Sequence, residues 1–157
     1  MSEKVDMIEE LGKHPFIKGL STDLISRVAE CADGIVHWTD DEVVFRSGGE
    51  ATKCYLIRTG EVALEMHSPG AGSRIIQTVA RGQVLGWSWL FPPYRWAFDA
   101  RVLTPTDAIV LDGAKVRQFL ETERDLGFDL IVRFGGLIAA RLQATRLQLM
   151  DLYASRS

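Results

Sequence analysis

The residues from Val84 to Val102 are the part of this chain best equipped to bind a small molecule. The segment reads V-L-G-W-S-W-L-F-P-P-Y-R-W-A-F-D-A-R-V and contains three of the four tryptophans. A glycine at position 86 allows a tight turn, and the Pro92-Pro93 step stiffens the aromatic stretch. Arg95 then brings one guanidinium, whose fork of N–H donors suits an anion. This combination predicts a cradle for a small molecule.

Two other interpretations of the same segment stay open at this point. Aromatic clusters usually form hydrophobic cores, whereas exposed tryptophans and arginines make docking surfaces for protein partners. Arg95 has an alternative role as an ion-pair partner of Asp99 or Glu50. We expect both X-Pro bonds to be trans, because cis bonds are the minority even before proline.

Short runs rich in β-branched and aromatic residues occupy the middle of the chain, from about 34 to 112. The runs are 35–38, 42–45, 55–57, 62–66, 74–79, 98–103 and 108–111. Turn residues such as Ser47-Gly48-Gly49 and Thr59-Gly60 separate them, and no helical pattern interrupts them. This spacing predicts a β-roll or jelly-roll rather than a parallel sheet with crossover helices.

Helical patterns flank the predicted β-roll on both sides. Apolar residues recur at helical spacing in the first thirty residues, where Ser21 is a candidate N-cap. A short helix is expected at 114–120 and a long one at about 125–153. The long helix would extend roughly 40 Å at about 1.5 Å per residue, more than a domain of this size is wide.

An apolar stripe follows the long helix at close to the spacing of a helix pair, about 3.5 residues. Its members are Ile131, Phe134, Ile138, Leu142, Leu149 and Leu152, with Thr145 between Leu142 and Leu149. We therefore expect a homodimer along this helix. The alternative is a helix that folds back over its own β-roll.

Composition narrows the classes of function. The 157 residues suit a single domain, and the net charge of −3 disfavours binding to nucleic acid through phosphate contacts. Cys31 and Cys54 lie outside any C-x-x-C motif and are expected to be buried thiols. The sequence has no membrane-spanning run and no signal peptide, so we expect a cytoplasmic protein. His14, His37 and His67 accompany no catalytic or metal-binding motif, so we expect neither an enzyme nor a metal site.

Three further segments carry a recognisable pattern. They read H-P-F-I-K-G-L-S at 14–21, D-E-V-V-F-R-S-G-G-E at 41–50 and Y-L-I-R-T-G-E-V at 55–62. In this order they resemble the cyclic nucleotide-binding domain of the catabolite activator and fumarate-nitrate regulator type, and the resemblance covers about 14–153. It implies a mainly β fold, a β-roll with N-terminal helices and a long C-terminal helix. We expect Gly60 to turn a hairpin with positive φ.

The resemblance also implies a ligand site in the cradle segment. In the family, a glycine and a glutamate precede a helical turn, and an arginine after the turn pairs with the cyclic phosphate. Gly86 and Arg95 match the glycine and the arginine, with Ser88 in the turn, whereas Trp87 replaces the glutamate and Trp96 a small residue. An indole has one N–H donor and no acceptor, so Trp87 cannot accept the ribose hydroxyl as the glutamate does.

Polar residues of the long helix complete the expected site, because in the family they cap the bound base. Thr145 is the principal candidate, with Arg141, Arg146 and Gln148 as its polar neighbours. Three functions stay open: weak binding of cyclic AMP or cyclic GMP helped by stacking on tryptophan, binding of another anionic small molecule, or an adaptor module whose pocket the aromatic side chains fill. All three describe a regulatory module without catalytic activity. The sequence stops where the family's helix-turn-helix domain would begin, so we expect no direct DNA binding, and the protein partner is unknown.

Overall fold

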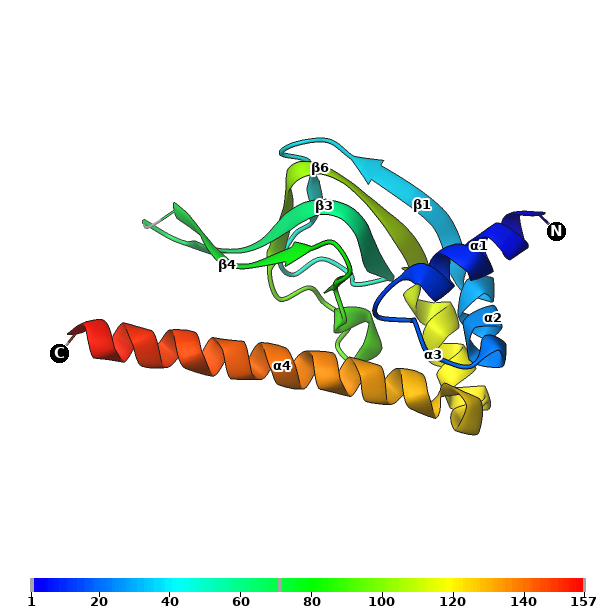
Figure 1. The fold of residues 1–157 in the computed structure, drawn as a ribbon. Helices are drawn as coiled ribbons and strands as arrows, with labels where there is room; N and C mark the ends of the chain where they lie inside the picture. Colours follow the sequence, from blue (N-terminus) through cyan, green and yellow to red (C-terminus); the bar gives the residue numbers. More distant parts are fainter. Residues whose placement is uncertain (1, 71, 157) are drawn as a thin grey trace.

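The fold is known from a computed structural model, which describes residues 2–70 and 72–156. The elements in chain order are α1 (Ser2–Lys13), α2 (Thr22–Glu30), β1 (Ala32–Trp38), β2 (Val43–Phe45), β3 (Lys53–Ser68), β4 (Gly72–Ala80), β5 (Val84–Leu85), the 3-10 turn η1 (Ser88–Leu90), β6 (Asp99–Asp112), α3 (Gly113–Thr122) and α4 (Arg124–Arg156). The helices flank the strands, as Figure 1 shows.

All six strands belong to one curled antiparallel sheet. Its main path runs β1-β6-β3-β4, and the short strands β2 and β5 pair with β6 and β3. The predicted β-roll with N-terminal helices and a long C-terminal helix is therefore confirmed.

Two strands are longer than the sequence predicts. The runs 55–57 and 62–66 are parts of β3, and the run 108–111 and all but the first residue of the run 98–103 are parts of β6. Gly60 has the expected positive φ of 93°, but the chain bends there inside β3 and does not reverse into a hairpin. A Cβ at Gly60 would lie 2.2 Å from the Thr106 hydroxyl and 2.4 Å from the Pro105 carbonyl oxygen. Only glycine lets the two bent strands approach this closely.

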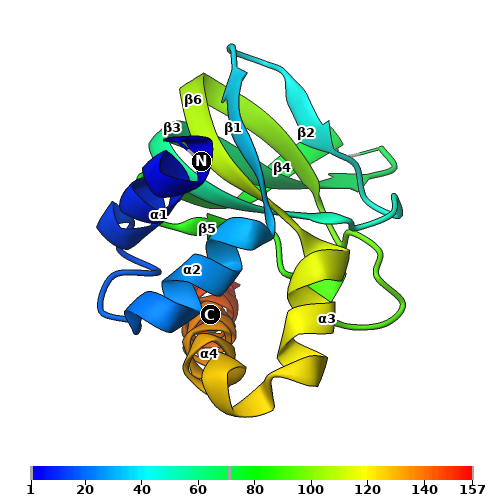
Figure 2. The same cartoon turned by 90° about the vertical axis from the view of Figure 1, so that its right-hand side faces the viewer.

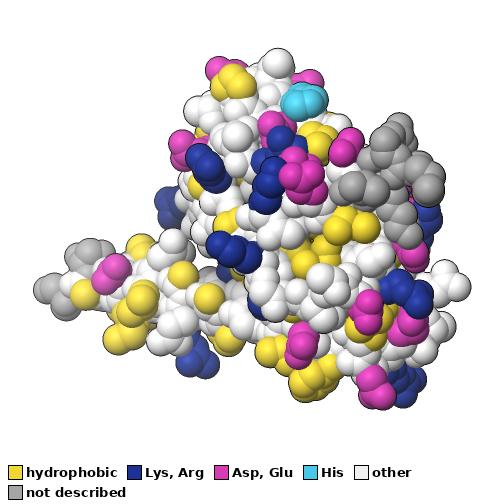
Figure 3. Space-filling model, turned by 45° about the vertical axis from the view of Figure 1, so that its right-hand side comes forward, with side chains coloured by type: hydrophobic (Ala, Val, Ile, Leu, Met, Phe, Trp, Pro, Cys, Tyr) yellow, Lys and Arg dark blue, Asp and Glu magenta, His cyan; other side chains and the backbone are white. Residues whose placement is uncertain are grey.

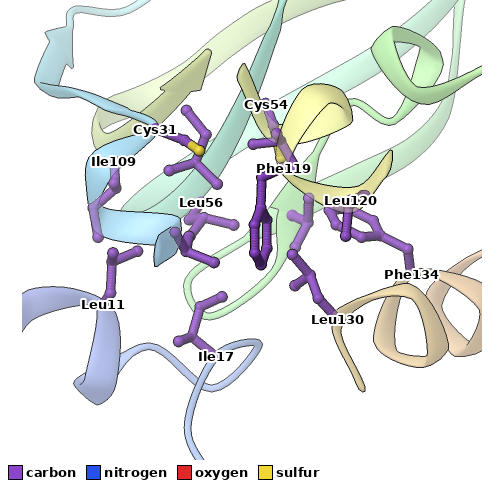
Figure 4. Packing of buried hydrophobic residues seen from close by; sticks show 14 of the residues in the cluster. Leu11, Ile17, Cys31, Cys54, Leu56, Ile109, Phe119, Leu120, Leu130 and Phe134 are labelled. Carbon is purple, nitrogen blue, oxygen red and sulfur yellow. The ribbon is translucent and has the colours of Figure 1, made fainter. Parts of the chain in front are cut away.

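Helices α1, α2 and α3 and the start of α4 gather at one end of the roll (Figures 1 and 2). The Ser21 hydroxyl accepts a hydrogen bond from the Leu24 amide, which confirms the predicted N-cap of α2. Side chains from all four helices meet strands β3 and β6 in one apolar cluster, part of which Figure 4 shows with Leu11, Leu56, Phe119 and Phe134. Cys31 and Cys54 are free and buried in the same cluster, as predicted.

Helix α4 packs one face of its first half into the core, whereas its second half is largely exposed. Leu130 and Phe134 are almost fully buried in the core. Beyond them, large apolar side chains are half or more exposed: Leu142, Leu147, Leu149, Met150, Leu152 and Tyr153. This half extends away from the helical end of the molecule, under the β3–β4 hairpin (Figure 1), and Figure 3 shows apolar side chains on the projecting part. The predicted stripe is thus divided, because Phe134 is buried in the core whereas Ile131 before it and Leu142, Leu149 and Leu152 after it are exposed.

Strand β4 is the last strand on the main path of the sheet. Its register with β3 skips Ile76, which lies between the pairs Gln77–Leu64 and Ile75–Glu65. The carbonyl of Ile76 accepts a hydrogen bond from the Gln148 side-chain amide, at 3.1 Å. This bond ties the second half of α4 to the sheet.

Candidate ligand-binding site

The cradle segment begins at Gly86, where β5 ends. Gly86 has a φ of 91°, and the chain continues into η1. The indole of Trp89 is fully buried and donates a hydrogen bond to the Gly86 carbonyl oxygen at 2.9 Å. It also meets Phe134 of α4 edge to face, with ring centroids 5.3 Å apart. Trp89 is therefore a core residue that fixes the turn and does not face a ligand.

Trp96 fills the cradle beside Gly86. Its side chain is only 6% exposed, and its ring stacks on Phe45 at a centroid distance of 3.8 Å and an interplanar angle of 7°. The ring lies so near that a Cβ added to Gly86 would approach it to 2.7 Å. The hollow that remains, lined by Gly86, Trp87, Ser88 and Trp96, has about 80 Å³. Ordinary small-ligand sites measure roughly 300–1,000 Å³, so this space is too small for a nucleotide.

Arg95 lies outside this hollow. The segment 94–96 pairs with 48–51, because the Trp96 amide donates to Gly49 and Arg95 forms a β-bridge with Glu50. Since side chains alternate along extended backbone, burying Trp96 turns Arg95 to the other face. Arg95 is exposed, and its Nη1 donates to the Gly48 carbonyl oxygen at 3.3 Å.

Within the described residues, Arg95 forms no ion pair with Asp99 or Glu50, and its side chain does not line the cradle hollow. It lines a different hollow of about 360 Å³, together with Glu50, Asp112 and Arg117. The carboxylate of Asp99 instead accepts the Ser47 amide at 2.7 Å. The Pro92–Pro93 bond that precedes this segment is cis, contrary to the expectation of trans.

A larger cavity of about 480 Å³ lies between the sheet and α4. Its lining comes from β3, β4, the cradle segment and α4: Leu64, Ile76, Gln77, Thr78, Trp87, Phe98, Ile138, Arg141, Leu142, Ala144, Thr145 and Gln148. Thr145, the candidate on the long helix, is thus brought to the same cavity as Trp87. Its hydroxyl donates to the Arg141 carbonyl oxygen one turn earlier, at 2.9 Å.

Arg141 occupies the junction of the two hollows, both of which it lines. Its Nη2 donates to the Val84 carbonyl oxygen at 3.0 Å, and its guanidinium carbon lies 4.6 Å from the centroid of the Trp87 ring. Burial lowers the pKa of Arg141 to about 10, because the charged form loses water on this half-buried site. The sequence places Arg141 next to Thr145 on one helix, but its contact with β5 spans 57 residues and follows only from the fold.

No group of three or more His, Cys, Asp or Glu side chains within 2–70 and 72–156 could hold a metal ion. Over the same ranges, no helix is long and apolar enough to cross a membrane.

Comparison with known proteins places this geometry in a family. The profile of the cyclic nucleotide-binding domain matches residues 35–123, more than half of the chain. The chain belongs to the cyclic nucleotide-binding domain family. A search of curated proteins found no match.

Several solved structures share the fold of this cyclic nucleotide-binding domain. A protein of Geobacter metallireducens GS-15, described as cyclic nucleotide-binding, is 25% identical over 85% of this chain and 96% of its own, with a TM-score of 0.75. A cyclic nucleotide-binding domain of Methylobacillus flagellatus KT is 20% identical over 96% and 84%, with a TM-score of 0.77. The catabolite activator protein of Thermus thermophilus is 19% identical over 88% and 62%, with a TM-score of 0.70.

Proposed function

We propose that this chain is a non-enzymatic regulatory module that binds a small anion in the cavity between the sheet and α4. The observation that carries the proposal is the position of Arg141, which places a guanidinium from α4 against β5 and Trp87 inside a cavity of ligand size. The anion's partner is then Arg141 and not Arg95.

The closed cradle supports this choice of site. Trp96 occupies the space beside Gly86, and Trp87 offers no acceptor for a ribose hydroxyl. Cyclic AMP or cyclic GMP in the family's usual pose would require Trp96 to leave its stack on Phe45. The second candidate function is an adaptor module with a filled pocket, which the stack of Trp96 on Phe45 favours. The cavity of about 480 Å³ beside this stack favours ligand binding instead.

Helix α4 is the element that can report ligand binding. It contributes Arg141 and Thr145 to the cavity, and its exposed second half carries the apolar residues suited to a homodimer. A ligand shifts such an element only if it binds two helix positions with different affinity. We expect a dimer in sedimentation velocity and a monomer for Leu149→Glu with Met150→Glu. A wild-type monomer at micromolar concentration would remove the dimer from the proposal.

Calorimetric titration with cyclic AMP and cyclic GMP tests the location of the site. The wild-type chain and Arg95→Ala are compared, since Arg95 is the family's phosphate partner and is exposed here. We expect the two proteins to give the same result with each nucleotide. Heat of binding that disappears in Arg95→Ala would show that the cradle opens and that the proposed site is wrong.

A further inference from the structure

The charge and the walls of the α4 cavity together define a class of ligand. We infer that the cavity takes a monocarboxylate with an apolar body, with its carboxylate on Arg141. This inference rests on the proposed function and adds the chemistry of the ligand to it.

The anion follows from the unbalanced charge of Arg141. The guanidinium is half-buried, and within the described residues it makes one hydrogen bond, to a neutral carbonyl oxygen, and no salt bridge. Trp87 covers one of its faces. A charge removed from water without a counter-charge is unfavourable, and burial accordingly lowers the pKa of this group to about 10. A carboxylate from outside would complete the pair.

The single charge of the ligand follows from the rest of the lining. Arg141 is the one charged residue among the described residues that line the cavity. A monoanion balances it, whereas a dianionic phosphate would leave one charge uncompensated in a partly dry site. A planar carboxylate also matches the fork of the guanidinium N–H groups that remain free.

The apolar body follows from the walls. Five of the residues that line the cavity with Arg141 have large apolar side chains: Leu64, Ile76, Phe98, Ile138 and Leu142. The cavity volume of about 480 Å³ lies within the range of small-ligand sites, roughly 300–1,000 Å³.

Few polar groups of the wall are free to bind a polar ligand. The Thr145 hydroxyl donates to Arg141 of its own helix, and the Gln148 amide donates to Ile76 of β4. Gln77, Thr78 and the Trp87 indole N–H make neither of these bonds, and the Thr145 and Gln148 oxygens can still accept. A ribose and a purine would bury more hydrogen-bonding groups than these few can satisfy, which is costly for each unpaired group.

Calorimetry with simple probes tests the class. The probes are butanoate, hexanoate and octanoate, with octan-1-ol and octyl phosphate as comparisons. We expect octanoate to bind, with affinity rising about fourfold for each added methylene as apolar surface is buried. Octan-1-ol is expected to bind at least about tenfold more weakly, because it offers no charge to Arg141, and octyl phosphate no more tightly than octanoate.

Variants of α4 locate the interaction. Arg141→Gln should weaken octanoate about 10- to 150-fold, the usual range for a lost charge-assisted hydrogen bond. Arg146→Gln is the matched control, because Arg146 is exposed on the same helix outside the cavity lining, and it should change nothing. Ala144→Trp fills the cavity and should abolish binding. Circular dichroism and thermal unfolding of each variant confirm that it is folded.

Three results would overturn the inference. They are no octanoate binding at millimolar concentration by the wild type, equal binding by Arg141→Gln, and binding of octyl phosphate tenfold tighter than octanoate. The first and third results concern the ligand class alone, whereas the second would also remove Arg141 as the anion's partner in the proposed site. A different result would contradict the proposed site itself: cyclic nucleotide binding by the wild type that is lost in Arg95→Ala.

Discussion

Truncation of Trp96 is the most direct test of the closed cradle. Trp96 is only 6% exposed, and a buried aromatic side chain removes about 150–250 Å² from water. At about 25 cal/mol per Å², that burial corresponds to about 4–6 kcal/mol, an upper value because the unfolded chain is itself partly collapsed. Measured Trp→Ala costs in cores are about 3–5 kcal/mol. We expect about 3–4 kcal/mol for Trp96→Ala, since the new space joins an existing hollow that water can enter.

Urea unfolding followed by far-UV circular dichroism measures this loss. At about 2–4 °C per kcal/mol for a chain of this size, the melting temperature should fall by about 6–16 °C. Phe91→Ala is the matched control in the same segment, because Phe91 is 50% exposed and its truncation should cost about 0.5 kcal/mol or less. A loss below about 1 kcal/mol for Trp96→Ala would refute the reasoning, because a ring packed between Phe45 and Gly86 cannot be removed so cheaply.

Three further measurements probe the frame around the site. Gly60→Ala should lower the free energy of unfolding by at least about 2 kcal/mol more than Gly70→Ala, because both glycines have positive φ but only a Cβ at Gly60 meets backbone; equal losses in urea unfolding would contradict this. Burial lowers the pKa of His14, so the folded state favours the neutral imidazole. The stability that this provides is complete above the unfolded pKa of about 6.5 and is lost as the pH falls below it. His14→Gln should therefore make the free energy of unfolding depend less on pH between about pH 8 and pH 5. Burial raises the pKa of Cys31 to about 11 and that of Cys54 to about 12. Neither thiol should react with Ellman's reagent at neutral pH until urea unfolds the protein. Rapid reaction of the native protein would contradict their burial.

The pH prediction depends on the contacts of one histidine. His14 Nε2 lies 2.8 Å from the Ile57 carbonyl oxygen, and its Nδ1 accepts the Phe16 amide at 3.2 Å. Protonation of Nδ1 removes that acceptor, and water cannot reach the buried ring to compensate. A pH dependence of stability that is the same with and without His14 would show that another group titrates.

The fold could be predicted largely because its signals are local. The alternation of apolar residues and the turn residues located the regions of β1, β2, β3, β4 and β6 but missed the two-residue strand β5, and Ser21 located the start of α2. The sequence could not distinguish a bend from a reversal at Gly60, because that outcome depends on Pro105 and Thr106 of β6 facing it across the sheet.

The site was predictable where it is contiguous and not where it depends on pairing between distant segments. Gly86, Trp87 and Ser88 follow one another, so their shared hollow follows from their spacing. The outward direction of Arg95 depends on pairing with Glu50, which lies 45 positions earlier. The position of Arg141 likewise depends on β5, to which no local pattern of the long helix points.

The hydrogen bond from Gln148 to Ile76 also has a consequence for the solubility of the chain. The outermost strand of a sheet is a template for pairing with other chains, and proteins guard it with bulges or with a covering element. Here Ile76 has no partner in the register with β3, and its carbonyl oxygen accepts the hydrogen bond from Gln148 of α4. The neighbouring Ile75 is 48% exposed. A shortened chain that ends before Gln148 would leave this edge uncovered, and we expect it to aggregate strand to strand, in a way unrelated to helix-mediated dimers.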